Sequence, residues 1–249
     1  MTLPLAANEG SRAVKRTIEF IRHHRLQKGD RLPSERELSD RFGVTRSSVR
    51  EALAVLDALR LTERRPKSGI FLRNALEDSG LDSLVVQANL DLPFDERTMR
   101  DVSEARIIFE SHAVGRACAR RTEADLARLR ELVAHYSRRV EAELNVADED
   151  VEFHLAMAAA SQNAIIVRTL TPLFLMSFQW RRKYFSSPVI RRHSLVDHQE
   201  FVAAIADRDE ARAVALVKEH VHSAFDEVLA LVEESVQPES GNLRADKDE

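Results

Sequence analysis

The stretch LPSERELSDRFGVTRSSVREALAVLDALRLTERRPKSGIFLR, residues 32–73, decides the fold of the N-terminal part of this chain. Ser34 followed three residues later by Glu37 has the pattern of a capping box, in which each side chain satisfies a backbone N–H of the other. The sequence therefore predicts a short helix over 35–42. Gly43 ends it, because glycine tolerates the positive φ that a tight turn requires.

A second helix and a hairpin follow this turn. Thr45 can cap the second helix, whose apolar residues recur at helical spacing, namely Val49, Leu53, Leu56 and Leu59. Two strands, 61–65 and 70–73, are then expected on either side of a charged tip that contains Pro, Ser and Gly. The pattern predicts a helix-turn-helix followed by a β-hairpin wing.

Basic and hydroxyl side chains lie where DNA would meet such a motif. Arg46 and Arg50 are four residues apart, so they project from one face of the second helix, near the N-terminal end that enters a major groove. The hydroxyls of Thr45, Ser47 and Ser48 are short donors suited to phosphate oxygens. Lys67, at the wing tip, would follow a phosphate backbone or minor groove. These residues are candidate DNA contacts.

This segment resembles the winged helix of the GntR family of bacterial transcription regulators, and it matches the family pattern almost throughout. It departs in two places, since Arg60 replaces a small or polar turn residue and the wing tip has a single glycine. The resemblance implies that Arg36 joins the second-helix arginines in contacting double-stranded operator DNA, and that Gly69 lets the wing backbone approach it closely. A solvated arginine paired with a neighbouring carboxylate is the alternative interpretation of Arg36.

Charge is divided unevenly along the chain. Residues 1–75 carry 16 Lys plus Arg against 9 Asp plus Glu, a balance of +7, whereas residues 76–249 carry 21 against 32, a balance of −11. The two balances add to the −4 of the whole chain. A basic segment attracts the phosphate backbone, and an acidic one is repelled from it.

The length of 249 residues is enough for two domains. The expected organisation is a disordered tail (1–10), a winged-helix domain with a first helix near 12–25 (11–75), a linker that becomes helical (76–98), an all-helical domain (99–235), whose effector-binding and dimerisation role is implied by a second resemblance given below, and a second tail (236–249). The single cysteine excludes an internal disulfide, and no secretory or membrane-spanning pattern is found. We expect a cytoplasmic protein without a membrane partner.

After about residue 99 every apolar pattern has a helical period, and the whole chain has only 7 Gly and 7 Pro. The candidate helices are 96–119, 122–145, 147–161, 163–185, 189–207 and 209–235. The predicted fold class is therefore mainly α, with an N-terminal winged helix-turn-helix and a C-terminal all-α bundle.

Four polar residues stand on apolar faces of these helices. Asp150 and His154 are four residues apart, and His198 and His220 each lie within an apolar stripe, whereas His222 lies on roughly the opposite side of its helix. One carboxylate and three imidazoles that converge would form a divalent-metal site. Separate hydrogen-bonded core histidines are the alternative, because periodicity does not reveal which helices meet.

Residues 99–234 resemble the FCD domain, the helical effector domain of the FadR subfamily of GntR regulators. The matching signals are D-x-x-F-H at 150–154, A-S-x-N at 160–163, H-x5-A-I-x3-D at 198–209 and A-x8-H at 211–220. The resemblance implies that the aspartate and three histidines named above hold a divalent metal ion, Zn²⁺ first and Mn²⁺ or Ni²⁺ as alternatives. It also implies a small organic acid as effector.

Arg106 is the candidate second anchor for the effector. It lies in the segment SEARIIFE and matches the pattern E-x-R-x-x-x-E of the family's first effector helix. A salt bridge to Glu110, four residues on, is the alternative. Arg181 and Arg182 are weaker candidates for the same role.

The expected function is a homodimeric transcription regulator, a repressor that releases a palindromic operator when the acid binds. A metal-dependent hydrolase with a DNA-binding appendage is an alternative, since His and Asp around a metal can activate water. Against it, the chain has Asp197-His198 where helical phosphohydrolases have His-Asp, although Glu152 and Asp197 stay open as general bases. A third alternative is an architectural DNA binder with a structural metal. We expect no enzymatic activity.

Overall fold

The computed structural model describes residues 9–73, 80–81, 85 and 96–236, and the chain divides into two compact units, residues 1–93 and 94–249. The predicted tails at 1–8 and 237–249 and most of the predicted linker lie outside the described residues. Glu9 and Gly10, which the sequence placed in a tail, instead form the first turn of a helix. The helix begins at Glu9 because the residues that follow form its buried apolar face.

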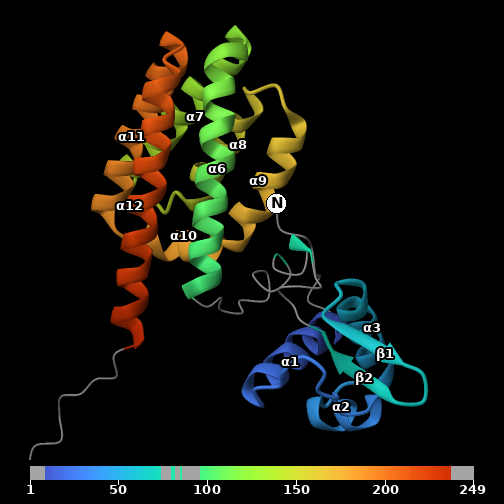
Figure 1. Cartoon of the computed structure of the whole chain (residues 1–249). Coiled ribbons are helices and arrows are strands. Elements are labelled where there is room, and N and C mark those ends of the chain that lie inside the picture. Colours follow the sequence, from blue (N-terminus) through green and yellow to red (C-terminus); the bar gives the residue numbers. More distant parts are fainter. Residues whose placement is uncertain (1–8, 74–79, 82–84, 86–95, 237–249) are drawn as a thin grey trace, which may run out of the picture. The chain divides into compact units, whose positions relative to one another are not determined.

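The N-terminal unit is a winged helix-turn-helix (Figure 1). Its elements are α1 (Glu9–His23), α2 (Glu35–Phe42), α3 (Arg46–Ala58), β1 (Thr62–Arg65) and β2 (Gly69–Leu72). Both predicted caps are present, because Ser34 and Glu37 form a reciprocal capping box and the Thr45 hydroxyl accepts from the backbone N–H of Ser48. Gly43 adopts the left-handed conformation with φ 59°. The buried core joins all three helices to the wing through Val14, Leu38, Val49, Leu53, Leu56 and Ile70.

The wing is a two-stranded antiparallel hairpin. Its register pairs Thr62 with Leu72 and Arg65 with Gly69. Arg60 precedes it at φ 58°, a left-handed conformation that costs an arginine more than a glycine. The departure from the family pattern therefore falls on the residue that turns the chain from α3 into β1.

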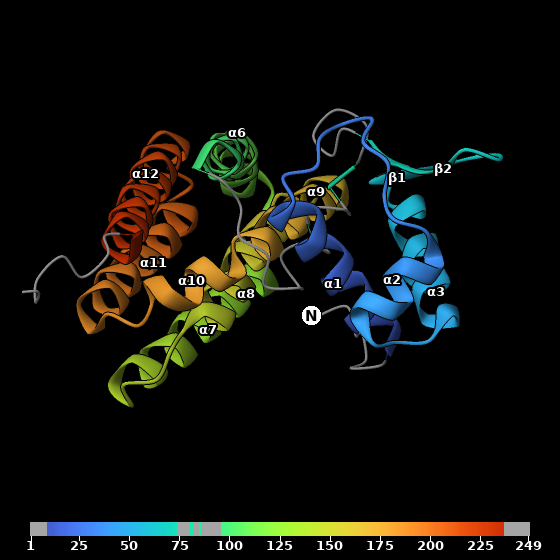
Figure 2. The same cartoon turned by 90° about the horizontal axis from the view of Figure 1, so that it is seen from below.

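The second unit is an all-helical bundle. Its helices are α6 (Glu96–Arg120), α7 (Glu123–Glu141), α8 (Ala147–Ala159), α9 (Ala164–Met176), α10 (Phe178–Tyr184), α11 (Pro188–Asp207) and α12 (Glu210–Val236). The long helices α6 and α12 lie side by side in both views (Figure 1, Figure 2). Apolar side chains from α6, α7, α8, α11 and α12 share one core, with Phe153, Met157, Phe201 and Ile205 at most 1% exposed.

The helix predicted over 163–185 is wrong in one respect, since it is broken at Ser177 into α9 and α10. The Ser177 hydroxyl donates to the backbone carbonyls of Leu173 and Phe174, both at 3.2 Å. A serine that bonds back to the preceding turn bends a helix. The break changes the direction of the chain just before Arg181.

The observed elements confirm the predicted fold class, a mainly helical chain with one small hairpin. In the part of the chain that the structure describes, none of the helices combines the length and the apolar character needed to cross a bilayer.

Candidate functional site

The N-terminal unit gathers five arginines around one hollow, which we call the arginine hollow. Its arginines are Arg31, Arg36, Arg46, Arg50 and Arg64. They come from the chain before α2, from α2, from α3 and from β1, so the helix-turn-helix and the wing both contribute. Such a concentration of guanidinium groups on exposed secondary structure is suited to phosphates and to the acceptor edges of guanine.

Glu35, at the first position of α2, holds two of these arginines. Its Oε2 lies 2.9 Å from Nε of Arg50, and its Oε1 lies 3.0 Å from Nη2 of Arg64. The hydrogen bond from Arg50, joined by the one from Arg64, holds the pKa of Glu35 below its ordinary value. The carboxylate therefore ties the recognition helix α3 to the wing.

The remaining predicted DNA contacts divide into exposed and buried residues. Arg36 is exposed and only loosely paired with Asp40, at 3.9 Å, so its guanidinium stays accessible. Thr45, Ser47 and Lys67 are exposed as well. Ser48 is the exception, because it is 7% exposed and its hydroxyl donates to the Glu9 carboxylate at 2.9 Å. Its side chain fixes α1 against α3 instead of facing solvent.

Gly69 makes room within the protein itself. It has φ 120°, and a Cβ there would lie 2.7 Å from Nε of Arg31. The absent side chain lets Arg31 lie against the wing at the edge of the arginine hollow. Sequence reasoning missed Arg31, Arg64 and Glu35, because spacing along the chain does not show that the wing, α2 and the segment before α2 meet at one hollow.

In the helical unit the four predicted ligands meet. Asp150 and His154 of α8, His198 of α11 and His220 of α12 are all buried, and one ligand atom of each lies within 4.8 Å of the others. We call them the four-ligand cluster. Nε2 of His198 lies 3.3 Å from Oδ1 of Asp150, and Nε2 of His154 lies 3.7 Å from the same oxygen.

Two further carboxylates orient the imidazoles. Nδ1 of His220 donates to Oδ2 of Asp197 at 2.8 Å, and Nδ1 of His154 lies 2.8 Å from Oε2 of Glu110. A carboxylate on one ring nitrogen turns the other nitrogen toward a metal and fixes the tautomer. The sequence alone indicates Glu110 as a partner of Arg106 and leaves Asp197 open as a general base, and neither role includes this contact to an imidazole.

The third imidazole is held by aromatic packing. The His198 ring stacks on Phe153 with centroids 4.1 Å apart, and it meets Tyr136 edge-on at 4.9 Å. Its two nitrogens, Nε2 of His154 and Oδ1 of Asp150 are buried without a hydrogen-bond partner among the described residues. Buried polar atoms are rarely left unpaired, so these donors fit a bound cation.

The electrostatics favour imidazoles in the ligand form. Burial lowers the pKa of His220 to about 4, although the hydrogen bond to Asp197 opposes it. Burial also holds the pKa of His198 well below its ordinary value. Neutral imidazole is the form that binds a metal, so no proton has to leave these two rings at neutral pH.

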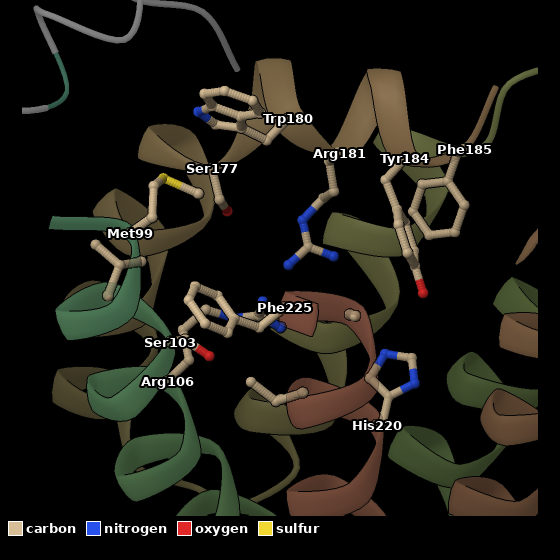
Figure 3. Close-up of a pocket in the computed structure, with 13 residues that line it drawn as sticks. Met99, Ser103, Arg106, Ser177, Trp180, Arg181, Tyr184, Phe185, His220 and Phe225 are labelled. Atoms are coloured by element: carbon tan, nitrogen blue, oxygen red, sulfur yellow. The ribbon is translucent and has the colours of Figure 1, made fainter. Parts of the chain in front are cut away.

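A pocket adjoins the cluster at His220, and we call it the inner pocket (Figure 3). Arg106 lines it and also holds Glu110, with Nε 2.7 Å from Oε1, so the salt bridge is present and the residue faces the pocket as well. Arg181 lines it too, and its guanidinium points into the space beside Phe225 and His220. Arg181 contacts the Asp150 carboxylate, whereas Arg182 is exposed.

The two proposed general bases are not placed for that role. Glu152 is 52% exposed and pairs with Arg128. Asp197 accepts from His220. The described residues therefore place no free carboxylate at the four-ligand cluster to activate a water molecule.

Comparison with known proteins gives the same division of the chain. Residues 11–72 match the bacterial regulatory proteins of the gntR family, and residues 101–223 match the FCD domain. The HTH-type transcriptional regulator LutR of Bacillus subtilis is 29% identical over 224 residues, which cover 88% of this chain and all of LutR. The Uxu operon transcriptional regulator of Escherichia coli K12 is 30% identical over 217 residues, covering 81% and 79% of the two chains.

Among solved structures, Lar, whose description states that it controls expression of the Listeria monocytogenes agr system, aligns with a TM-score of 0.65. The alignment covers 89% of this chain and 97% of Lar at 21% identity. At that identity the likeness concerns the fold, and it spans both units.

Proposed function

Because this chain belongs to the GntR family of bacterial transcription regulators, in the FadR-type branch with an FCD domain, we propose that it is a metal-dependent sensor of a small carboxylate. It is a DNA-binding transcriptional regulator and not an enzyme. The proposal concerns what its helical unit binds and how that binding acts on DNA.

The observation that carries the proposal is the four-ligand cluster with its oriented imidazoles, next to an arginine-lined pocket. Asp150, His154, His198 and His220 would hold one divalent ion, and Zn²⁺ suits a set of three imidazoles and one carboxylate. A bound ion supplies positive charge and an open coordination position for a carboxylate oxygen. Arg106, which also lines the inner pocket, would hold the same ligand.

In the N-terminal unit we assign DNA contacts to the exposed residues of the predicted set. Arg46 and Arg50 would read bases, whereas Arg36, Thr45, Ser47 and Lys67 would hold phosphates. Ser48 supports the recognition helix through Glu9. The unit would act as a homodimer on a palindromic operator, with the acid favouring the arrangement that releases DNA.

Metal binding is tested by elemental analysis of protein purified without chelator, which should find about one ion per chain. Chelation should lower the melting temperature, because an ion that binds only the folded state stabilises it, by about 2.7 kcal/mol at a hundredfold excess over Kd. His198→Ala should abolish the chelator effect. His222→Ala is the matched control, since His222 is exposed on α12 outside the cluster. An unchanged chelator effect in His198→Ala would contradict the ligand assignment.

Sensing is tested on an operator selected from random DNA. Fluorescence anisotropy should show release of this DNA when a panel of small carboxylates is added to metal-loaded protein, and no release from chelated protein. DNA binding that ignores every acid, with the metal bound, would favour the architectural alternative with a structural metal.

A further inference from the structure

The charges around the inner pocket limit the charge of its ligand. Among the side chains that the structure describes, the charged ones that line the pocket or contact the four-ligand cluster are Arg106, Arg181, Glu110, Asp150 and Asp197. Two cations and three carboxylates leave one net negative charge, which a divalent ion would turn into one net positive charge. A single carboxylate neutralises this balance, whereas a second carboxylate would leave an uncompensated charge in a buried site.

One guanidinium, already paired with Asp150 through one nitrogen, keeps a further donor for that carboxylate. Arg181 is 7% exposed, and its Nε has no hydrogen-bond partner within the described parts of the chain. The guanidinium carbons of Arg106 and Arg181 lie 4.8 and 5.0 Å from the centroid of the same ring, Phe174. An anion between the two cations relieves their repulsion.

The walls of the pocket restrict the rest of the ligand. Apolar side chains supply most of the lining, among them Met99, Val102, Trp180, Phe185, Val221 and Phe225. The uncharged polar groups of the lining, apart from His220, are the hydroxyls of Ser103, Ser177 and Tyr184 and the indole N–H of Trp180, and the hydroxyl of Ser177 already donates to two backbone carbonyls. A ligand with several hydroxyl groups would bring more donors and acceptors than these walls can pair.

The pocket is also small. Its volume is about 50 Å³, whereas an apolar cavity that holds benzene has roughly 150 Å³. With the carboxylate held at the metal, only an alkyl chain of about two to four carbons has to fit this space, which is too small for a six-membered ring.

From charge, walls and size together, we propose that the inner pocket takes a short aliphatic monocarboxylate, about three to five carbons long, in preference to dicarboxylates and polyhydroxy acids. The carboxylate would lie among the metal, Arg106 and Arg181, and the alkyl chain would pack against the apolar walls. This inference rests on the proposed function, namely that a carboxylate binds beside the metal.

The test uses three acids with the same number of carbons, butanoate, succinate and L-threonate. Calorimetry on the full-length, Zn²⁺-loaded protein should give butanoate a Kd at least tenfold lower than either of the others. Equal or tighter binding of succinate or threonate, still dependent on metal, would overturn the inference and leave the proposed function intact. Failure of all three acids to bind, with or without metal, would contradict both.

A pair of neighbouring variants tests the anchor. Arg181→Gln should weaken butanoate binding at least tenfold, because the guanidinium donors are lost. Arg182→Gln is the matched control, since Arg182 is exposed and lies outside the pocket lining. Circular dichroism checks that both variants fold. Wild-type affinity for butanoate in a folded Arg181→Gln would show that Arg181 does not hold the carboxylate.

Discussion

Arg50 of the N-terminal unit and Arg106 of the helical unit each hold a glutamate, at 2.9 Å and 2.7 Å. The surroundings differ. The side chains of Arg50 and Glu35 are 68% and 22% exposed, whereas those of Arg106 and Glu110 are 8% and 0% exposed. The two arginine–glutamate pairs therefore have nearly the same length, but one is exposed to water and the other is buried.

This difference decides what each arginine can do. An exposed pair contributes about 0–1 kcal/mol, so a phosphate or a base edge can replace the carboxylate of Glu35 at little cost. A buried pair that loses one partner leaves an uncompensated charge, which costs about 3–5 kcal/mol. The arginines that pair with Glu35 can exchange its carboxylate for a DNA group. Arg106 stays paired with Glu110 and can offer a ligand only its remaining donors.

The largest effect is expected from breaking the buried pair. Glu110→Ala should lower the free energy of unfolding by about 3–5 kcal/mol, because Arg106 loses its partner in the interior. Urea denaturation of chelated protein measures this without a contribution from metal. Glu104→Ala, an exposed carboxylate on the same helix, is the control. A loss of unfolding free energy below about 1 kcal/mol would show that water reaches the Arg106–Glu110 pair. The buried pair would then not differ from the exposed pair of Arg50 and Glu35.

A smaller effect is expected on DNA recognition. Arg50→Ala should reduce discrimination between operator and random DNA by about 1–3 kcal/mol, since one bidentate contact to a base is lost. Salt titrations followed by anisotropy measure both affinities. Arg130→Ala, an exposed arginine of α7, removes the same charge from the other unit and should leave discrimination unchanged. An equal loss on both DNAs would assign Arg50 to phosphate.

The smallest effect is expected from Glu35→Gln. Stability should change by less than about 1 kcal/mol, because water screens the exposed pairs that are lost. Affinity for random DNA should rise, since a negative charge leaves the arginine hollow and both of its arginines are released. Fluorescence anisotropy on random and on operator DNA gives the ratio of the two affinities. If operator binding falls as far as in Arg50→Ala, Glu35 itself contacts the DNA. In that case DNA does not replace the Glu35 carboxylate as the partner of Arg50.

The sequence predicted features that depend on neighbours along the chain. The capping box at Ser34, the cap at Thr45 and the helical faces of His154 and His198 follow from spacing, and the structure contains all of them. Contacts between distant elements could not be derived in this way. Glu35 meets Arg64 across 29 positions, and Arg181 meets Asp150 across 31.

Two residues show the limit of spacing. Ser48 stands beside Arg46 in the sequence, but helical rotation carries its hydroxyl under α1 to Glu9. The sequence predicts a continuous helix through Arg181, whereas the break at Ser177 places this residue in the pocket lining. Periodicity gives the face of a helix, whereas tertiary packing decides what that face meets.

Gly69 has a consequence for how sequence variation at the wing should be interpreted. Its position on a solvent-exposed hairpin would ordinarily tolerate many residues, yet φ 120° is open almost only to glycine. A larger residue would strain the backbone and also displace the side chain of Arg31. In a saturation mutagenesis experiment this surface position should therefore behave like an interior one, and lost DNA binding there would report on Arg31 as much as on the wing itself.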